Sequence, residues 1–291
     1  MFNKIRPIYR FFKKMRMRYI VRKLDKANNS THGLFSSGRR LNNNIIVSLT
    51  SHGPRVQSVY LSIESILRGS IVPCKIILWL DDENIYNSLP DTLLKLKSKG
   101  VDILLSKNYG PHTKYFPYIL KGDFSKWLVT ADDDIIYPKT WLSDLWKNKQ
   151  SSSKEILCHR AHTIAFCTDL SFRKYNEWEP CKTTKRNVAN FATGVSGVLY
   201  PPDFQSLLFK EGTQFLSKCP KADDVWLHYV SFKYGYEIRQ LTKNSKHFTI
   251  IDNSQDQGLR NDNVNNNFND NQILKTYSLK DMKDIYYKSR K

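Results

Sequence analysis

Short apolar segments alternate with helical segments along most of this chain from Asn44 onward, and this alternation limits the possible folds more than any other feature. Continuous apolar runs are typical of strands buried on both faces, and the amphipathic stretches between them have helical spacing. The predicted strands are 45–49, 75–80, 101–105 and 126–130, and the predicted helices are 56–68, 91–99, 140–147 and 223–234. We therefore expect an α/β fold with a mostly parallel central sheet and helices on both faces.

The chain length and composition fit one folded domain with an extension. The 291 residues are 40% hydrophobic and 25% charged, as in an ordinary folded protein. No apolar run approaches the roughly 20 residues of a membrane-spanning helix. The basic N-terminus is followed by no apolar signal-peptide core. We predict a linker at 27–44, a loop at 261–271, an N-terminal extension over 1–43 and a single domain over 44–291.

Positive charge is concentrated at the N-terminus. The formal net charge is +19, and residues 1–26 contain ten basic residues and one acid. The remaining residues hold 36 bases against 26 acids, so the rest of the chain is only mildly basic. Nucleic acid is therefore not expected as a partner. Pro7 is expected to keep a helix out of the first turns. Residues 8–26 then form either a basic amphipathic helix at an anionic membrane surface or a solvated basic tail.

Three consecutive aspartates follow the predicted strand 126–130. Like charges this close raise the pKa of each other, and a divalent ion removes that penalty. Oxygen ligands suit Mg²⁺ or Mn²⁺ shared with substrate phosphates. Asp132, Asp133 and Asp134 could instead form a turn in which one carboxylate caps the next helix.

The wider sequence resembles GT-A-fold glycosyltransferases that use nucleotide sugars, particularly the family-2-like enzymes of bacterial capsule and lipopolysaccharide clusters. The segment 130–142 resembles their Asp-x-Asp region, and six further segments lie in the order that this family has. These segments are 47–55, 75–82, 158–162, 194–202 and 222–226, with 269–272 near the C-terminus. The resemblance covers about residues 44–275 and implies a GT-A-like single domain.

The resemblance implies a metal and donor site at the strand ends. Asp132 and Asp134 would hold Mn²⁺ or Mg²⁺, with Asp134 the stronger candidate and His247 a third ligand. The ion would act as a Lewis acid on the leaving nucleoside diphosphate. The other residues expected to contact the donor are Thr50, Arg55, Asp81, Asp82, Lys114, Asp133, Gly194 and Gly197.

The segment 222–226 maps to the position of the carboxylate base in such enzymes. An acceptor hydroxyl is a poor nucleophile, so a nearby carboxylate must take its proton. Asp224 is our first choice for this base and Asp223 the second, although either could cap a helix instead. Gly194 and Gly197 could equally be simple turn residues.

Two further patterns argue against a disulfide framework and against a zinc site. The five cysteines contain no Cys-x-x-Cys pair, which favours free thiols in a reducing compartment. Cys158, His159 and His162 lack the usual zinc spacing, so polar residues of the core or of an acceptor pocket are expected there.

These features together predict a metal-dependent, inverting glycosyltransferase. Its donor would be a UDP-sugar, and its acceptor a glycan or lipid-linked glycan in bacterial surface polysaccharide synthesis. The expected location is cytoplasmic, at the inner face of the cytoplasmic membrane. The alternative is a basic protein that binds nucleic acid or an anionic surface without catalysis.

Overall fold

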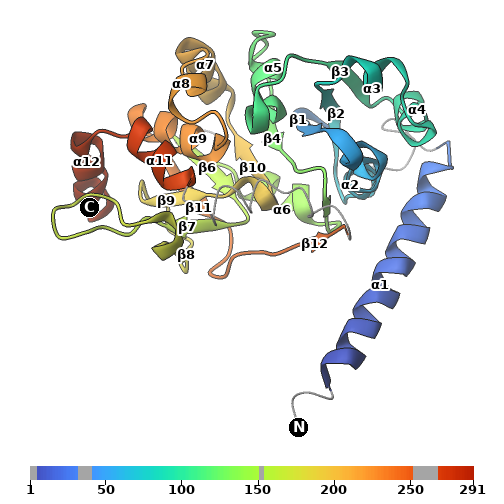
Figure 1. The fold of residues 1–291 in the computed structure, drawn as a ribbon, viewed down its shortest axis with the longest axis horizontal. Coiled ribbons are helices and arrows are strands. Elements are labelled where there is room, and N and C mark those ends of the chain that lie inside the picture. Colours follow the sequence, from blue (N-terminus) through green and yellow to red (C-terminus); the bar gives the residue numbers. More distant parts are fainter. Residues whose placement is uncertain (1–4, 32–40, 151–153, 252–267) are drawn as a thin grey trace.

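The computed structural model describes residues 5–31, 41–150, 154–251 and 268–291 (Figure 1). In these residues, seven strands form a central sheet in the order β11-β6-β10-β4-β1-β2-β3. The strands are β1 (Leu41–Ser51), β2 (Val72–Leu80), β3 (Asp102–Leu105), β4 (Trp127–Thr130), β6 (Glu155–Cys158), β10 (Val198–Tyr200) and β11 (Glu237–Gln240). Within this described sheet, β10 alone runs antiparallel to its neighbours. The expectation of a mostly parallel sheet is confirmed.

Helices cover both faces of the sheet, as expected. The helices on one face are α2 (Val59–Leu67), α4 (Asp91–Ser98) and α6 (Trp141–Asn148), which pack with Ile45, Val47 and Leu49. Those on the other face are α5 (Phe116–Ile119), α7 (Pro202–Glu211), α8 (Phe215–Lys218), α9 (Asp223–Lys233), α11 (Phe268–Thr276) and α12 (Leu279–Ser289). Ile46 points into this second core, because successive strand residues point to opposite faces. A short helix, α3 (Glu83–Asn87), follows β2.

Two small sheets lie beside the central one. Strands β8 (Glu179–Pro180), β7 (Ala161–Thr163) and β9 (Asn190–Ala192) form one of them in that order. Strand β12 (Thr249–Ile250) pairs antiparallel with β5 (Ile135–Ile136), which directly follows the acidic triplet. The β12–β5 pair therefore brings a late part of the chain next to Asp134, whose carbonyl accepts the Ile251 N–H at 2.8 Å.

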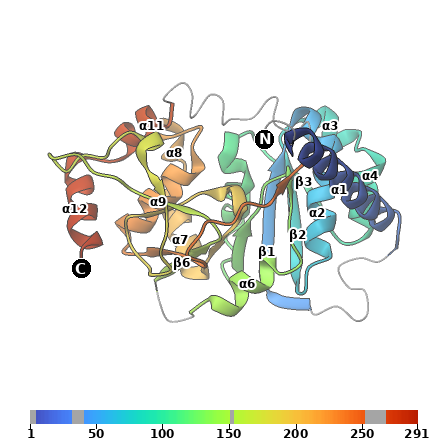
Figure 2. The same ribbon diagram turned by 90° about the horizontal axis from the view of Figure 1, so that it is seen from below.

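The N-terminal helix α1 (Ile5–Asn28) is longer than predicted and runs through Pro7. Proline is tolerated there because the first N–H groups of a helix have no partner inside the helix. One stripe of α1, including Met17, Leu24 and Ala27, is buried. Figures 1 and 2 show α1 beside α2 and α4, with its N-terminal half extending beyond the body.

A buried lysine fixes the end of α1 to the domain. Lys99 Nζ donates to the Ala27 carbonyl at 2.7 Å and to Glu64 Oε1 at 2.5 Å. A lysine near a helix C-terminus satisfies carbonyls that the helix leaves unpaired. Lys99 therefore joins the C-terminal end of α1 to α2 of the domain.

Two other local predictions differ from the structure. The predicted linker 27–44 is helical up to Asn28, and β1 already begins at Leu41 beside β2. The predicted loop 261–271 lies partly outside the described residues, but its last part, from Phe268, is the start of α11. Buried Ile273 explains α11, because its contact with the second core offsets a polar sequence of low helix propensity. No helix in the described ranges is long and apolar enough to cross a membrane.

Candidate active site

The acidic triplet leaves β4 at the carboxyl end of the parallel strands, and its three carboxylates take different partners. The backbone N–H of Asp132 donates to the Tyr137 hydroxyl at 2.7 Å, which closes the turn before β5. Asp132 is the most accessible of the three, with 21% of its side chain exposed, against 6% for Asp133 and 9% for Asp134. Ligands of such sheets bind beyond the carboxyl ends of the strands. Asp132 therefore faces the expected ligand region.

Asp133 ties the triplet to the loop after β1. Its carboxylate accepts hydrogen bonds from Ser51 Oγ at 2.7 Å and from Arg55 Nη1 at 3.0 Å. Burial raises the pKa of Asp133, although Arg55 and Ser51 oppose this shift. Arg55 Nη1 also lies 3.8 Å from Asp134 Oδ2. Arg55, predicted to contact the donor, thus contacts two carboxylates of the triplet here, and Asp133 holds the turn in place.

Lys114 connects the triplet to the start of α9. It ends the 3₁₀ turn Gly110–Lys114, and its Nζ lies 3.0 Å from Asp132 Oδ1 and 3.2 Å from Asp223 Oδ2. Burial works against the charged ammonium, yet Asp132, Asp223 and Asp224 raise the pKa of Lys114 well above its ordinary value. The ammonium therefore stays charged in the middle of three carboxylates.

Asp223 and Asp224 occupy the first turn of α9, and Ala222 is the N-cap. The predicted alternative, capping by one of these aspartates, is not observed. Asp224 Oδ1 accepts the Gly194 N–H at 3.0 Å. Burial, followed by the charge of Asp223, raises the pKa of Asp224 to about 8. A carboxylate with a pKa in this range can accept and release a proton near neutral pH.

The two predicted glycines have different roles. A Cβ on Gly194 would lie 3.1 Å from Asp224 Oδ1 and 3.4 Å from Lys114 Nζ. Gly194 therefore lets the backbone approach the carboxylates closely. Gly197 has φ +91°, and a Cβ there would lie 2.7 Å from the Trp141 ring. The structure thus explains Gly197 by its packing on Trp141, and its expected approach to the donor remains a prediction.

The other predicted donor residues are less closely associated with the cluster. Thr50 Oγ1 donates to the Trp79 carbonyl at 3.1 Å, inside the sheet. Asp82 caps α3 by accepting the N–H groups of Asn84 and Ile85. Asp81, at the end of β2, has no hydrogen-bond or ion-pair partner among the described residues and is half-buried. Of the three, Asp81 is the one whose side chain makes no hydrogen bond within the described residues.

His247 lies just before the strand that pairs with β5 after the acidic triplet. The register of β12 pairs Ile250 with Ile135 and Thr249 with Ile136. His247 precedes β12, and its charge acts on His162. Its expected role as a third metal ligand remains a prediction. No group of three His, Cys, Asp or Glu side chains in the described part of the chain is arranged to hold a metal ion.

The carboxylate cluster nevertheless fits a dication that is shared with a ligand. Asp132, Asp223 and Asp224 outnumber Lys114 by three to one, and the buried Asp223 Oδ2 lacks a hydrogen bond of good geometry. Mg²⁺ and Mn²⁺ commonly use one or two carboxylates and complete their shell with phosphates and water. Asp132 is the most accessible carboxylate of the triplet for such an ion, and Asp134 is two residues further on.

Sequence reasoning missed part of the wall next to Asp224. Arg160 Nη1 donates to Thr193 Oγ1 at 3.1 Å, and its Nη2 lies 3.1 Å from His162 Nε2. The Tyr175 ring lies 5.9 Å from that of His162. Burial raises the pKa of Tyr175, and the charge of Asp224 adds to the effect. Tyr175 follows an irregular stretch, so no periodic pattern could have placed it at this site.

The fold has known counterparts among solved structures. The chain superposes on GalNAc-T7 with UDP, GalNAc and Mn²⁺ at a TM-score of 0.51 and 11% identity, covering 75% of this chain and 46% of that one. The chain thus spans about half the length of that protein. The sheet order and this superposition agree with the expected fold. It is a GT-A-like fold.

Two further solved structures are more distant. A mannosyltransferase from Pyrobaculum calidifontis with GDP-Man and Mn²⁺ has a TM-score of 0.46 and 8% identity, covering 83% of this chain and 65% of that chain. The inositol-1-phosphate CTP transferase from T. maritima has a TM-score of 0.45 and 11% identity, covering 74% and 92%. Neither a family model nor a curated protein matches the sequence.

Proposed function

We propose that this chain is a metal-dependent glycosyltransferase that moves a sugar from a nucleotide sugar, with a UDP-sugar as the expected donor, to a glycan or lipid-linked glycan. One observation carries the proposal. Asp132 and the Asp223–Asp224 pair come from distant segments and converge on Lys114 at the carboxyl end of the sheet. This reaction needs carboxylates that hold a metal ion, a role proposed for Asp132 with Asp134. It also needs a carboxylate that takes the proton of the acceptor hydroxyl, a role proposed for Asp224 or Asp223.

The donor would bind at the Asp132 side of the cluster. Asp132 and Asp134 would hold Mn²⁺ or Mg²⁺, which when bound supplies Lewis-acid stabilisation of the leaving diphosphate. Lys114 would contact the same diphosphate, and the charged ammonium that lies 3.0 Å from Asp132 supports this role. Asp81, at the next strand end, would accept hydrogen bonds from the nucleoside.

The acceptor would bind at the Asp224 side. Asp224 would take the proton from an acceptor hydroxyl while that oxygen forms a bond to the anomeric carbon and the bond to the diphosphate breaks. The hydrogen bond from Gly194 orients the carboxylate, and Asp223 is the alternative base. Attack from the side opposite the leaving group inverts the anomeric configuration. Arg160 and Tyr175 would form the adjoining wall of the acceptor site.

The exposed face of α1 supports attachment to an anionic membrane surface. Phe12, Met15 and Tyr19 are 63%, 51% and 67% exposed and lie on the side of the helix opposite the docked stripe. Arg16, Lys23 and Lys26 share that exposed side at helical spacing. Apolar side chains among basic ones are typical of helices that lie in the headgroup layer. We propose that α1 places the enzyme at the inner face of a bacterial cytoplasmic membrane, where lipid-linked glycans of surface polysaccharides are assembled.

A donor screen tests the proposed function. UDP-, GDP-, dTDP- and CMP-sugars, each with Mn²⁺, should include at least one that raises the melting temperature, because ligand binding to the native state adds stability. The same nucleotide sugar without Mn²⁺ should give a smaller shift, and EDTA should abolish the difference. If no nucleotide sugar stabilises the protein while nucleic acid or anionic vesicles do, the chain is a binding protein and the proposal is wrong.

A further inference from the structure

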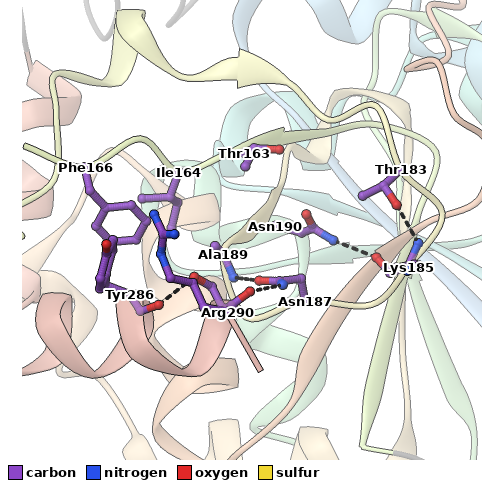
Figure 3. Close-up of a pocket in the computed structure, with 11 residues that line it drawn as sticks. Thr163, Ile164, Phe166, Thr183, Lys185, Asn187, Ala189, Asn190, Tyr286 and Arg290 are labelled. Atoms are coloured by element: carbon purple, nitrogen blue, oxygen red, sulfur yellow. Dashed lines mark hydrogen bonds between the residues drawn. The ribbon is translucent and has the colours of Figure 1, made fainter.

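A cavity of about 350 Å³ lies between the small β8-β7-β9 sheet and α12, and its lining contains none of the clustered aspartates (Figure 3). Its volume is at the lower end of the roughly 300–1,000 Å³ of small-molecule sites. Thr163 of β7 lines it, and the preceding residue His162 belongs to the wall beside Arg160. Successive strand residues point to opposite faces, so the cavity and the candidate active site lie on opposite faces of this small sheet.

The floor of the cavity is held by internal hydrogen bonds. Asn187 donates to the Ser289 carbonyl at 2.8 Å and accepts the Ala189 N–H at 2.7 Å. Asn190 donates to the carbonyls of Lys185 and Ile238 at 3.1 and 2.8 Å. These amides are therefore used to join α12 to β9 and β11. The cavity is preformed, which lowers the entropic cost of binding a ligand.

The charged groups around the cavity are all positive. Lys185 and Arg290 line it from different segments, and no acidic residue does. Neither side chain has an ion-pair partner among the described residues. The Arg290 guanidinium lies 4.4 Å from the centre of the Tyr286 ring, which also lines the cavity. Cations at the lining favour a ligand that carries an anionic group.

The walls between these cations are mostly apolar. Ile164, Phe166, Ala189 and Tyr286 form them, and the Phe166 and Tyr286 rings meet edge to face at 5.2 Å. A bare phosphate ion would lose hydration against such walls without gaining contacts. A sugar ring has apolar C–H faces and a polar rim, so it can contact the walls while its charged substituent meets Lys185 or Arg290.

We propose that this cavity is a second ligand site that binds an anionic sugar unit of a glycan, one that carries a carboxylate or a phosphate. The identity of that glycan as the acceptor rests on the proposed function. The site would hold an acidic unit of the acceptor away from the transfer site, and it would favour acidic glycans over neutral ones of equal length.

Calorimetric titration of the full chain without nucleotide or metal tests this directly. Cellobiuronic acid and cellobiose form a matched pair that differs by one carboxylate, and glucose 6-phosphate and inorganic phosphate complete the set. We expect cellobiuronic acid and glucose 6-phosphate to bind at least about tenfold more tightly than cellobiose. One charge-assisted hydrogen bond accounts for a difference in affinity of this size. Inorganic phosphate should bind more weakly than glucose 6-phosphate.

Variants locate the binding. The Lys185→Gln/Arg290→Gln pair should weaken binding of the acidic sugars about tenfold or more. The matched control Lys182→Gln/Lys283→Gln removes two exposed charges from the same segments but outside the lining, and it should bind normally. Equal loss in both pairs would show a diffuse charge effect and overturn the proposal. Equal binding of phosphate and glucose 6-phosphate would reduce the cavity to a simple anion site and overturn it as well.

The test separates this inference from the proposed function. Asp134→Ala should lose stabilisation by donor and Mn²⁺ but keep its affinity for cellobiuronic acid. If no nucleotide sugar stabilises the protein but the acidic sugars still bind, only the transferase assignment is overturned. Donor stabilisation without binding of either acidic sugar would overturn only the second site.

Discussion

The ammonium of Lys114 lies 3.0 Å from Oδ1 of Asp132, and the same nitrogen also pairs with a carboxylate at the start of α9. One cation therefore joins the proposed donor side and the proposed acceptor side of the site. Because three carboxylates surround it, the balance of charge here determines both the stability of the domain and the chemistry of the site.

Removing this cation should destabilise the fold. Lys114→Gln leaves Asp132, Asp223 and Asp224 close together without a buried positive charge, and losing one partner of a buried pair costs about 3–5 kcal/mol. The loss should be larger at pH 8 than at pH 5.5, because Asp224, whose pKa is raised to about 8, is protonated at the lower pH and then repels its neighbours less. Urea unfolding at both pH values measures it. Adding Asp223→Asn should recover part of the stability, and a purely additive double variant would contradict the charge argument.

Asp224→Asn should raise stability and remove transfer. The folded-state pKa of about 8 lies above the ordinary value of 3.8, so between these values the native state binds a proton that the unfolded state has released. Stability therefore falls as the pH rises from about 4 to 8, and an uncharged Asn escapes this loss. The melting temperature at pH 8 should rise by a few degrees, at about 2–4 °C for each kcal/mol.

The control for this variant is Asp284→Asn on α12, which should change neither stability nor activity. The Asp224→Asn variant should still be stabilised by donor and Mn²⁺. If it transfers sugar at the normal rate, Asp223 or another group is the base.

The two glycines should respond differently to alanine. In Gly197→Ala, the new methyl group meets the Trp141 ring at 2.7 Å with φ at +91°, and we expect a loss of about 2–4 kcal/mol. Gly194→Ala meets only the ends of the Asp224 and Lys114 side chains, so the fold should survive while transfer falls at least tenfold. Thermal melts and turnover measured on both variants check this. If Gly197→Ala is as stable as the unchanged protein, the contact with Trp141 does not require glycine at this position.

Asp134→Ala should abolish Mn²⁺-stimulated donor hydrolysis or transfer and leave the fold intact. Asp132→Ala should do the same, with an added loss of stability because Lys114 loses its partner at 3.0 Å. Hydrolysis of the nucleotide sugar with and without EDTA is the measurement. Activity in the Asp134→Ala variant that EDTA does not reduce would refute the metal assignment.

The membrane prediction needs a variant that leaves α1 in place. Deleting 1–26 would also remove buried Met17 and Leu24, so loss of function there would be ambiguous. Met15→Ser/Tyr19→Ser changes only the exposed face. It should weaken binding to vesicles that contain anionic lipid at least tenfold and leave the melting temperature unchanged. If the variant sediments with such vesicles as the unchanged protein does, Met15 and Tyr19 do not contribute to membrane binding.

Much of the fold followed from local patterns. The apolar run after Asn44 could be recognised as a strand because a parallel strand is buried on both faces, and the structure places Ile45 and Ile46 in opposite cores. The positions of Asp81 and Asp132 at strand ends followed in the same way, since the carboxyl ends of parallel strands meet at one edge. The length of α1 was misjudged at Pro7 because a first-turn proline and a helix-breaking one look alike in sequence.

The sequence by itself determined which chemically active residues lie at the ends of strands and helices. The reason is that the spacing of apolar residues, and the residue types that begin or end an element, are properties of neighbouring residues. Only the tertiary structure decided their partners. It joined Lys114 to Asp132 and Asp223 and paired Arg55 with Asp133. These contacts depend on loop paths and strand register across the sheet, and such long-range pairings leave no periodic trace in the chain.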